Sequence, residues 1–205
     1  RSLGGTDGTL LMGYGAWNGT VIPKDYADKF DNSDIRKKQF RFGADPNGPR
    51  PAGFINYPPE IDNLDDPGAD RDAGIRNIKF WPKPPMNSGG ASNDFPIFRY
   101  ADILLMKAEC LVRSNRAGDA KTLVDQVRTR AGLQALAGAP SLQNIYDERG
   151  FELTMEAHRR QDMIRFGTFT QAHGLAPAVD DHFKLFPIPT SALNANPNLA
   201  QNSGF

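Results

Sequence analysis

The stretch FRYADILLMKAECLV, residues 98–112, decides the fold class of this chain. Its apolar residues recur three and four positions apart, the spacing at which side chains share one face of an α-helix. Together with the residue before it, they are Ile97, Ala101, Leu104, Leu105, Ala108, Leu111 and Val112. We therefore predict a helix with one buried stripe, started by Asp94 and Pro96.

A second stripe follows after SNRAGD, residues 114–119, interrupts the period. It consists of Ala120, Leu123, Val124, Val127 and Ala131. Gly132 then ends the pattern, because glycine adopts the left-handed conformation that closes many helices. The short connection predicts a hairpin of two antiparallel helices. Small alanines would let their backbones approach closely, as in stacked repeats of the tetratricopeptide type.

A third helix is predicted from Ser141, its N-cap, to Gly167. It contains YDERGFELTMEAHRR, residues 146–160. At about 100° per residue, five charged side chains fall on one stripe beside the apolar sector. They are Glu148, Arg149, Glu152, Glu156 and Arg159. Because these charges border the core, we interpret them as a partly buried, cross-paired structural network.

Catalysis and metal binding fit this stripe less well. A di-iron bundle needs Glu-x-x-His, but His158 follows Glu156 by two positions, and Met155 stands three positions after Glu152. HExxH is absent, and the histidines show no ligand spacing. Neighbouring carboxylates paired with arginines would both stay ionised, which disfavours the acid and base roles of a glycosidase. A helical glycoside hydrolase remains an alternative, with no metal or cofactor expected.

The composition excludes other classes of protein. The chain has 205 residues, 39% of them hydrophobic, with 24 acidic and 24 basic side chains, so nucleic acid is not an expected partner. No apolar run approaches the roughly 20 residues of a membrane span. The sequence starts at Arg1 without a signal segment or lipid-acceptor cysteine, and we expect a fragment of a longer protein. The single cysteine, Cys110, is expected to be a small buried residue.

The first half of the chain has a different character. Residues 1–95 contain 13 of the 20 glycines and 10 of the 16 prolines, and no helical period. We expect residues 1–96 to be loop-rich, to pack on the helices and to carry a ligand surface. Residues 97–205 would form the helical scaffold, with an extended FPIP tail, and the two parts would belong to one larger domain. The acidic segment from Asp62 to Asp72 breaks the EF-hand pattern, so we interpret it as a solvated turn and leave calcium binding open.

Four blocks of this sequence resemble a known family. FRYADILLMKAECLV and VDQVRTRAGL are similar to consecutive helices of the starch-utilisation-system D family (SusD/RagB). IYDERGFELTMEAHRRQDMIRFG and LFPIPTSALNANPNLAQNSGF resemble its next two blocks, in the same order. Ala157, Phe166 and Phe205 replace a usual Gly, Trp and Tyr, which changes packing details but removes no charge partner.

The resemblance implies a mainly α, tetratricopeptide-like fold and no enzymatic activity. It implies a lipoprotein on the outer membrane of a Gram-negative bacterium, anchored at the cell surface by an N-terminal lipid that this sequence lacks. Such a protein binds an oligosaccharide or polysaccharide and delivers it to a SusC-like TonB-dependent transporter. A peptide or another nutrient is the alternative cargo, and the missing N-terminal part is a further expected partner, covering an exposed hydrophobic flank.

The family's ligand contacts lie on variable loops, so no binding residue is carried over. A sugar presents C–H faces and hydroxyls, and an exposed aromatic ring beside polar groups suits both. In the loop-rich half we predict such rings at Tyr14, Trp17, Tyr57 and Trp81. The alternative for each ring is that it anchors a loop onto the scaffold.

Overall fold

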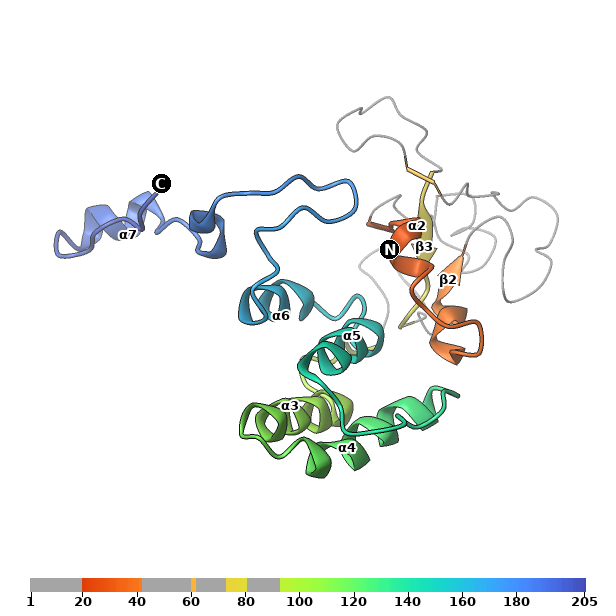
Figure 1. Cartoon of the computed structure of the whole chain (residues 1–205). Helices are drawn as coiled ribbons and strands as arrows, with labels where there is room; N and C mark the ends of the chain where they lie inside the picture. Colours follow the sequence, from red (N-terminus) through yellow and green to blue (C-terminus); the bar gives the residue numbers. More distant parts are fainter. Residues whose placement is uncertain (1–19, 42–59, 62–72, 81–92) are drawn as a thin grey trace. The chain divides into compact units, whose positions relative to one another are not determined.

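The computed structural model describes residues 20–41, 60–61, 73–80 and 93–205 (Figure 1). These residues belong to two compact units, of which the first ends at His158 and the second is Arg159–Phe205. Across the described ranges the chain is mainly helical, with three strands of two or three residues, which confirms the expected fold class. None of the helices in these ranges combines the length and the apolarity needed to span a bilayer.

The N-terminal part of the first unit is a small antiparallel sheet with short helices. Its elements are β1 (Val21–Ile22), α2 (Lys24–Ala27), the 3₁₀ helix η1 (Ile35–Gln39), β2 (Phe40–Arg41) and β3 (Ile75–Asn77). The strand order is β1-β3-β2, with Val21 opposite Arg76 and Phe40 opposite Asn77. Strands this short carry no detectable alternation, which is why the sequence did not predict them.

This sheet contributes one hydrophobic core. Its buried members are Ile22, Ala27, Phe30, Phe40 and Ile75. The Phe30 ring lies 4.7 Å from the ring of Phe151, which belongs to a later helix, and the Tyr26 hydroxyl donates to the Gly150 carbonyl at 2.7 Å. The early segments are therefore attached to the helical part of the same unit.

The expected helical hairpin is present as α3 (Tyr100–Arg113) and α4 (Ala117–Arg130). The helices pack on each other through buried Leu104, Leu105, Ala108, Ala120, Val124 and Val127. Helix α3 begins only at Tyr100, so Ile97 precedes it and is 71% exposed instead of buried. At the end of α4, Gly132 has φ +83° and the Ala131 carbonyl accepts from the Ile35 amide of η1 at 3.0 Å.

The second face of α3 is apolar and exposed. Ile103, Met106 and Cys110 lie three and four positions apart and point away from the buried stripe. The expectation of a buried Cys110 is wrong, because this residue lies about 200° around the helix from Ala108.

The third helix is divided in two. The predicted N-cap is present, with Ser141 and Asn144 forming a capping box at the start of α5 (Leu142–Glu152). The expected continuation to Gly167 is wrong: a second helix, α6, covers Arg159–Arg165. Between them Met155 and Ala157 adopt positive φ values of 62° and 64°, which a regular helix excludes.

Side chains from elsewhere explain why α5 stops. In a continued helix the Glu152 carbonyl would accept from the Glu156 amide, but that amide donates to the Leu153 carbonyl instead. The Glu152 carbonyl accepts from Lys79 Nζ at 2.8 Å and from Arg99 Nη2 at 2.5 Å. These two donors replace the intrahelical hydrogen bond and so stabilise the end of the helix.

The second unit contains α6, the 3₁₀ helix η2 (Asp181–Lys184) and α7 (Thr190–Ala195). Before α7, the FPIP segment (residues 186–189) is neither helix nor strand. The Gln201 side chain holds it by accepting from the Ile188 amide at 2.8 Å and donating to the Ile188 carbonyl at 3.0 Å. The Arg160 guanidinium lies over the rings of Phe169 and Phe186, at 4.9 and 4.3 Å from their centroids. The short helix α7 was not predicted.

Candidate functional site

The predicted aromatic platforms lie outside the described residues. This holds for Tyr14, Trp17, Tyr57 and Trp81, and equally for the acidic segment at 62–72. Their roles stay predictions. Most of residues 1–96 lie outside the described ranges as well, so the division into a loop-rich and a helical part also stays a prediction.

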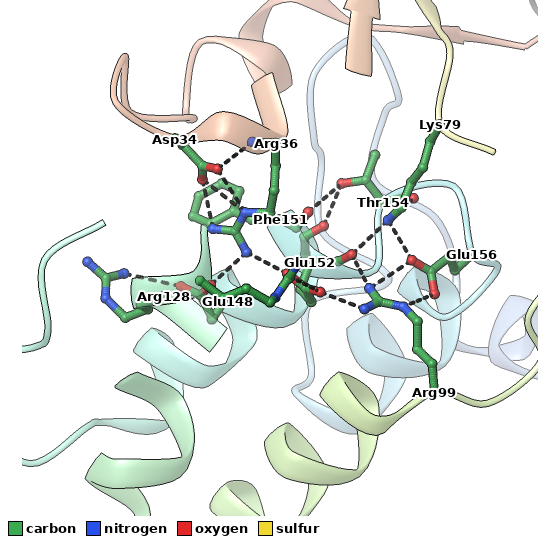
Figure 2. A network of polar contacts seen from close by, with 12 residues as sticks. Asp34, Arg36, Lys79, Arg99, Arg128, Glu148, Phe151, Glu152, Thr154 and Glu156 are labelled. Carbon is green, nitrogen blue, oxygen red and sulfur yellow. Dashed lines mark hydrogen bonds and ion pairs between the residues drawn. The ribbon is translucent and has the colours of Figure 1, made fainter. Parts of the chain in front are cut away.

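Glu152, in the last turn of α5, is the centre of a network in which buried carboxylates pair with arginines and a lysine (Figure 2). Its side chain is 2% exposed. Oε1 accepts from Arg99 Nη1 at 2.6 Å and from Arg130 Nη2 at 2.5 Å, and Oε2 accepts from Arg36 Nη1 at 3.0 Å. One carboxylate thus joins an arginine before α3, the end of α4 and the 3₁₀ helix η1.

Glu148, one turn earlier on α5, extends the network toward the N-terminal segment. It accepts from Arg36 Nη1 at 2.7 Å and from Arg128 Nη1 at 3.1 Å. On the other side Asp34 accepts from Arg36 Nε at 2.9 Å and Nη2 at 2.7 Å, and also caps η1. The Arg36 guanidinium therefore lies between three carboxylates, which compensates for its loss of water.

Glu156, in the break after α5, forms the opposite end of the network. Arg99 donates to both of its oxygens, from Nε at 2.6 Å and from Nη2 at 2.8 Å. Lys79 Nζ donates to Glu156 at 2.5 Å, to the Glu152 carbonyl and to the Thr154 carbonyl at 3.2 Å. All three ammonium hydrogens of Lys79 are thereby in use.

The pKa values of these groups have opposing causes. Burial alone would raise the pKa of Glu156, but the hydrogen bonds from Arg99 and Lys79 lower it below its ordinary value. For Lys79 burial prevails and lowers its pKa, in spite of the hydrogen bond to Glu156. The pKa of Arg36 is raised, because hydrogen bonds and charges from Asp34 and Glu148 outweigh burial. Glu156 is therefore a carboxylate at neutral pH, without a proton to donate as a general acid.

Among the described contacts, three of the five charged residues singled out by the helical wheel come together. Glu148, Glu152 and Glu156 share the network, whereas Arg149 donates to Asp102 of α3 at 2.8 Å, both side chains being buried. Arg159 is the first residue of α6, in the second unit. The helix assumed in the wheel is interrupted before Arg159, and the place of Arg159 in the network stays a prediction.

Several partners in the network were missed by sequence reasoning. They are Asp34, Arg36, Lys79, Arg99, Arg128 and Arg130. Arg99, Arg128 and Arg130 lie within the FRYAD and VRTR motifs, so those motifs carried a signal that could have been used. Asp34, Arg36 and Lys79 come from the irregular half and carry no local signal.

A cavity of about 290 Å³ opens beside the network in the first unit. It is lined by Ile35, Arg36, Gln39, Lys79, Phe80, Arg99, Arg130 and Glu152. Four of these residues are cationic, and two are apolar. Within the part of the chain that the structure describes, no grouping of His, Cys, Asp and Glu is arranged to hold a metal ion.

Comparisons with known proteins agree on one family. The model of the SusD family matches residues 17–178. The starch-binding protein SusD of Bacteroides thetaiotaomicron is 32% identical over 63% of this chain and 25% of that protein. A SusD-like protein of Formosa agariphila is 32% identical over 93% of this chain and 36% of that protein. The chain thus spans about a quarter to a third of the length of these relatives.

Solved structures show the same fold. Surface glycan-binding protein A from Bacteroides uniformis superposes with a TM-score of 0.68 at 22% identity, covering 92% of this chain and 42% of that one. Surface glycan-binding protein A from Bacteroides thetaiotaomicron, solved in complex with laminarihexaose, gives a TM-score of 0.62 at 26% identity, with 91% and 42% covered. The tetratricopeptide-like architecture expected from the helical hairpin is therefore shared with these proteins.

Proposed function

This chain belongs to the SusD family, and from that premise we propose that it is part of a non-catalytic protein that binds an oligosaccharide or polysaccharide. The observation that carries the proposal is the likeness over 91% of the chain to a protein solved with laminarihexaose, at 26% identity. The 32% identity to a starch-binding protein supports the same ligand class.

The network around Glu152 supports a binding role over a hydrolytic one. A glycosidase needs one carboxyl that holds a proton and one that faces the substrate. Here Glu148, Glu152 and Glu156 are each at most 3% exposed, and their oxygens accept from arginines or a lysine. Such carboxylates join segments of the fold instead of attacking a glycosidic bond.

The proposal extends to the place and the partner of the full-length protein. We place it at the outer-membrane surface, held by a lipid, where it delivers glycan to a SusC-like TonB-dependent transporter. Membership of the SusD family supports both assignments. Pull-down of the transporter by the full-length protein from outer-membrane extracts would test them, and a protein recovered from the cytoplasmic fraction would contradict them.

Glycan binding itself is tested by calorimetric titration of the chain with laminari-oligosaccharides, malto-oligosaccharides and a peptide mixture. We expect heat from an oligosaccharide and no release of reducing sugar. Binding of peptides, without binding of any oligosaccharide, would show that the ligand is a peptide and not a glycan. Turnover that disappears in Glu152→Gln would instead establish a hydrolase.

The aromatic platforms are tested in the same titrations. We expect Trp17→Ala and Trp81→Ala to weaken glycan binding without lowering the melting temperature. Phe98→Ala is the matched control, because this ring is 74% exposed and lies outside the predicted platforms. An unchanged affinity together with a lost fold would assign both tryptophans to loop anchoring.

A further inference from the structure

The cavity beside the charge network has a positive wall. Within the described part of the chain, the network joins five cations to four carboxylates. The cations are Arg36, Lys79, Arg99, Arg128 and Arg130, and the carboxylates are Asp34, Glu148, Glu152 and Glu156. Four of the five cations line the cavity, against one carboxylate. An anionic group in the cavity would balance the excess charge.

Among the described contacts, Arg130 is the cavity-lining cation with the most donors left for a ligand. Arg36 donates to three carboxylates, Arg99 to two carboxylates and a carbonyl, and Lys79 uses all three of its hydrogens. Arg130 is 57% exposed and, among the described residues, donates only from Nη2 to Glu152. A guanidinium has five N–H donors in a planar fork that matches a carboxylate.

Gln39 adds a second specific feature. Its Oε1 atom is buried and accepts no hydrogen bond from any residue that the structure describes, although buried acceptors are normally satisfied. Gln39 is the last residue of η1 and lines the cavity together with Arg130. The atom is closed to solvent, so the Gln39 side chain has to turn toward the cavity before a ligand hydroxyl can supply the missing donor. The cavity would then suit a molecule that carries both a hydroxyl and an anionic group.

The remaining wall is apolar. Phe80 and Ile35 line it, and Phe80 has φ 61°, a conformation that is uncommon for a bulky residue and is found at ligand sites. The volume of about 290 Å³ is close to the lower limit of roughly 300 Å³ for small-molecule sites, which corresponds to one sugar unit rather than a chain. An aromatic ring offers a surface to the C–H face of such a unit.

We propose that this cavity binds one acidic sugar unit, a monosaccharide with a carboxylate beside its hydroxyls. The carboxylate pairs with Arg130, a hydroxyl donates to Gln39 Oε1, and the ring lies against Phe80. This inference rests on the proposed glycan binding and narrows its ligand class. A neutral sugar would leave the remaining donors of Arg130 without a carboxylate acceptor and would bind more weakly.

The test compares glucuronate with glucose, which differ at one carbon, by titrating the chain and following heat or NMR shifts. We expect glucuronate to bind about tenfold or more tightly than glucose, and Arg130→Gln to remove that difference. Gln39→Leu should weaken glucuronate binding without lowering the melting temperature, because it deletes an acceptor that has no partner. Arg116→Gln, which removes a 64% exposed arginine on α4's N-terminal side, is the matched control and should change neither.

Arg130→Lys keeps the charge beside Glu152 if the glutamine variant fails to fold. It should bind glucuronate with intermediate affinity, because an ammonium lacks the fork. Equal affinities for glucuronate and glucose, or undiminished glucuronate binding by Arg130→Lys and Gln39→Leu, would overturn the inference.

The titrations with oligosaccharides separate this inference from the proposed function. If neutral oligosaccharides bind equally to the wild type and to Arg130→Lys while glucuronate does not bind, the cavity inference is wrong and glycan binding stands. If glucuronate binds in an Arg130-dependent way but no oligosaccharide does, the cavity takes free sugar acids and the proposed function is wrong.

Discussion

The two units of the molecule differ in what they bury. Among the described residues, every buried apolar side chain, from Ile22 to Leu153, belongs to the first unit, as does the charge network. Among the described residues of the second unit, only Asp162 is buried. The first unit is thus stabilised mainly by buried side chains. The second unit is stabilised by surface contacts, such as those of Arg160 with the rings of Phe169 and Phe186. Removing one interior partner should therefore cost more than removing one surface partner.

The largest effect is expected for Glu152→Ala. The variant removes the buried carboxylate that Arg36, Arg99 and Arg130 share, and Arg36 is itself only 9% exposed. We expect the free energy of unfolding to fall by about 3 to 5 kcal/mol, measured by urea denaturation. A variant that keeps its full stability would break the comparison, since the network would then not hold the first unit together.

Acid should destabilise the first unit through Glu156. The pKa of Glu156 is lowered in the folded state, so its contribution to stability is present above its ordinary value of 4.5 and is lost as the pH falls through the lower, folded value. Glu156→Gln should therefore be less stable than the wild type near neutral pH and should lose less stability below about pH 4.5. Urea midpoints over this range measure both. Parallel pH profiles for the two proteins would contradict the prediction.

A smaller effect is expected for Arg160→Ala in the second unit. Arg160 contacts two aromatic rings and donates to the Phe183 carbonyl at 2.7 Å, but Phe186 remains 70% exposed. We expect a loss of about 1 kcal/mol, seen as faster amide hydrogen exchange within residues 159–205. A loss as large as that of Glu152→Ala would show that the second unit has an interior of its own.

The smallest effect is expected for Arg116→Gln. Arg116 and Asp119 form an ion pair in which both side chains are more than half exposed. Such pairs contribute little, so the melting curve should shift by no more than the equivalent of about 0.5 kcal/mol. A clear shift of the melting curve would show that an exposed ion pair, without burial, contributes substantially to the stability of this unit.

The helical part of the fold could be predicted where the pattern that defines a helix lies within the helix itself. The stripes of α3 and α4 and the Ser141 cap are local patterns, and the structure confirms them. The continuation of α5 to Gly167 failed because the donors that end it, Lys79 and Arg99, lie more than 50 residues away in sequence. Hydrophobic periodicity cannot detect donors at that distance.

The candidate site shows the same limit. Its acids could be selected from spacing on α5, but Arg36 and Lys79 come from a half with no regular period. The cavity is lined by residues from η1, the segment after β3, Arg99, Arg130 and α5, so it exists only after these segments meet. No local pattern could have located it.

The division of α5 from α6 has a consequence for the order of folding. The α3–α4 hairpin closes through neighbours in sequence, whereas the end of α5 requires Lys79 and Arg99, which are 73 and 53 residues from Glu152. Contacts between distant parts of a chain form slowly, because closing the loop loses entropy before the contact contributes favourable free energy. We expect the hairpin to nucleate early and the last turn of α5 to become ordered in the final, rate-limiting phase.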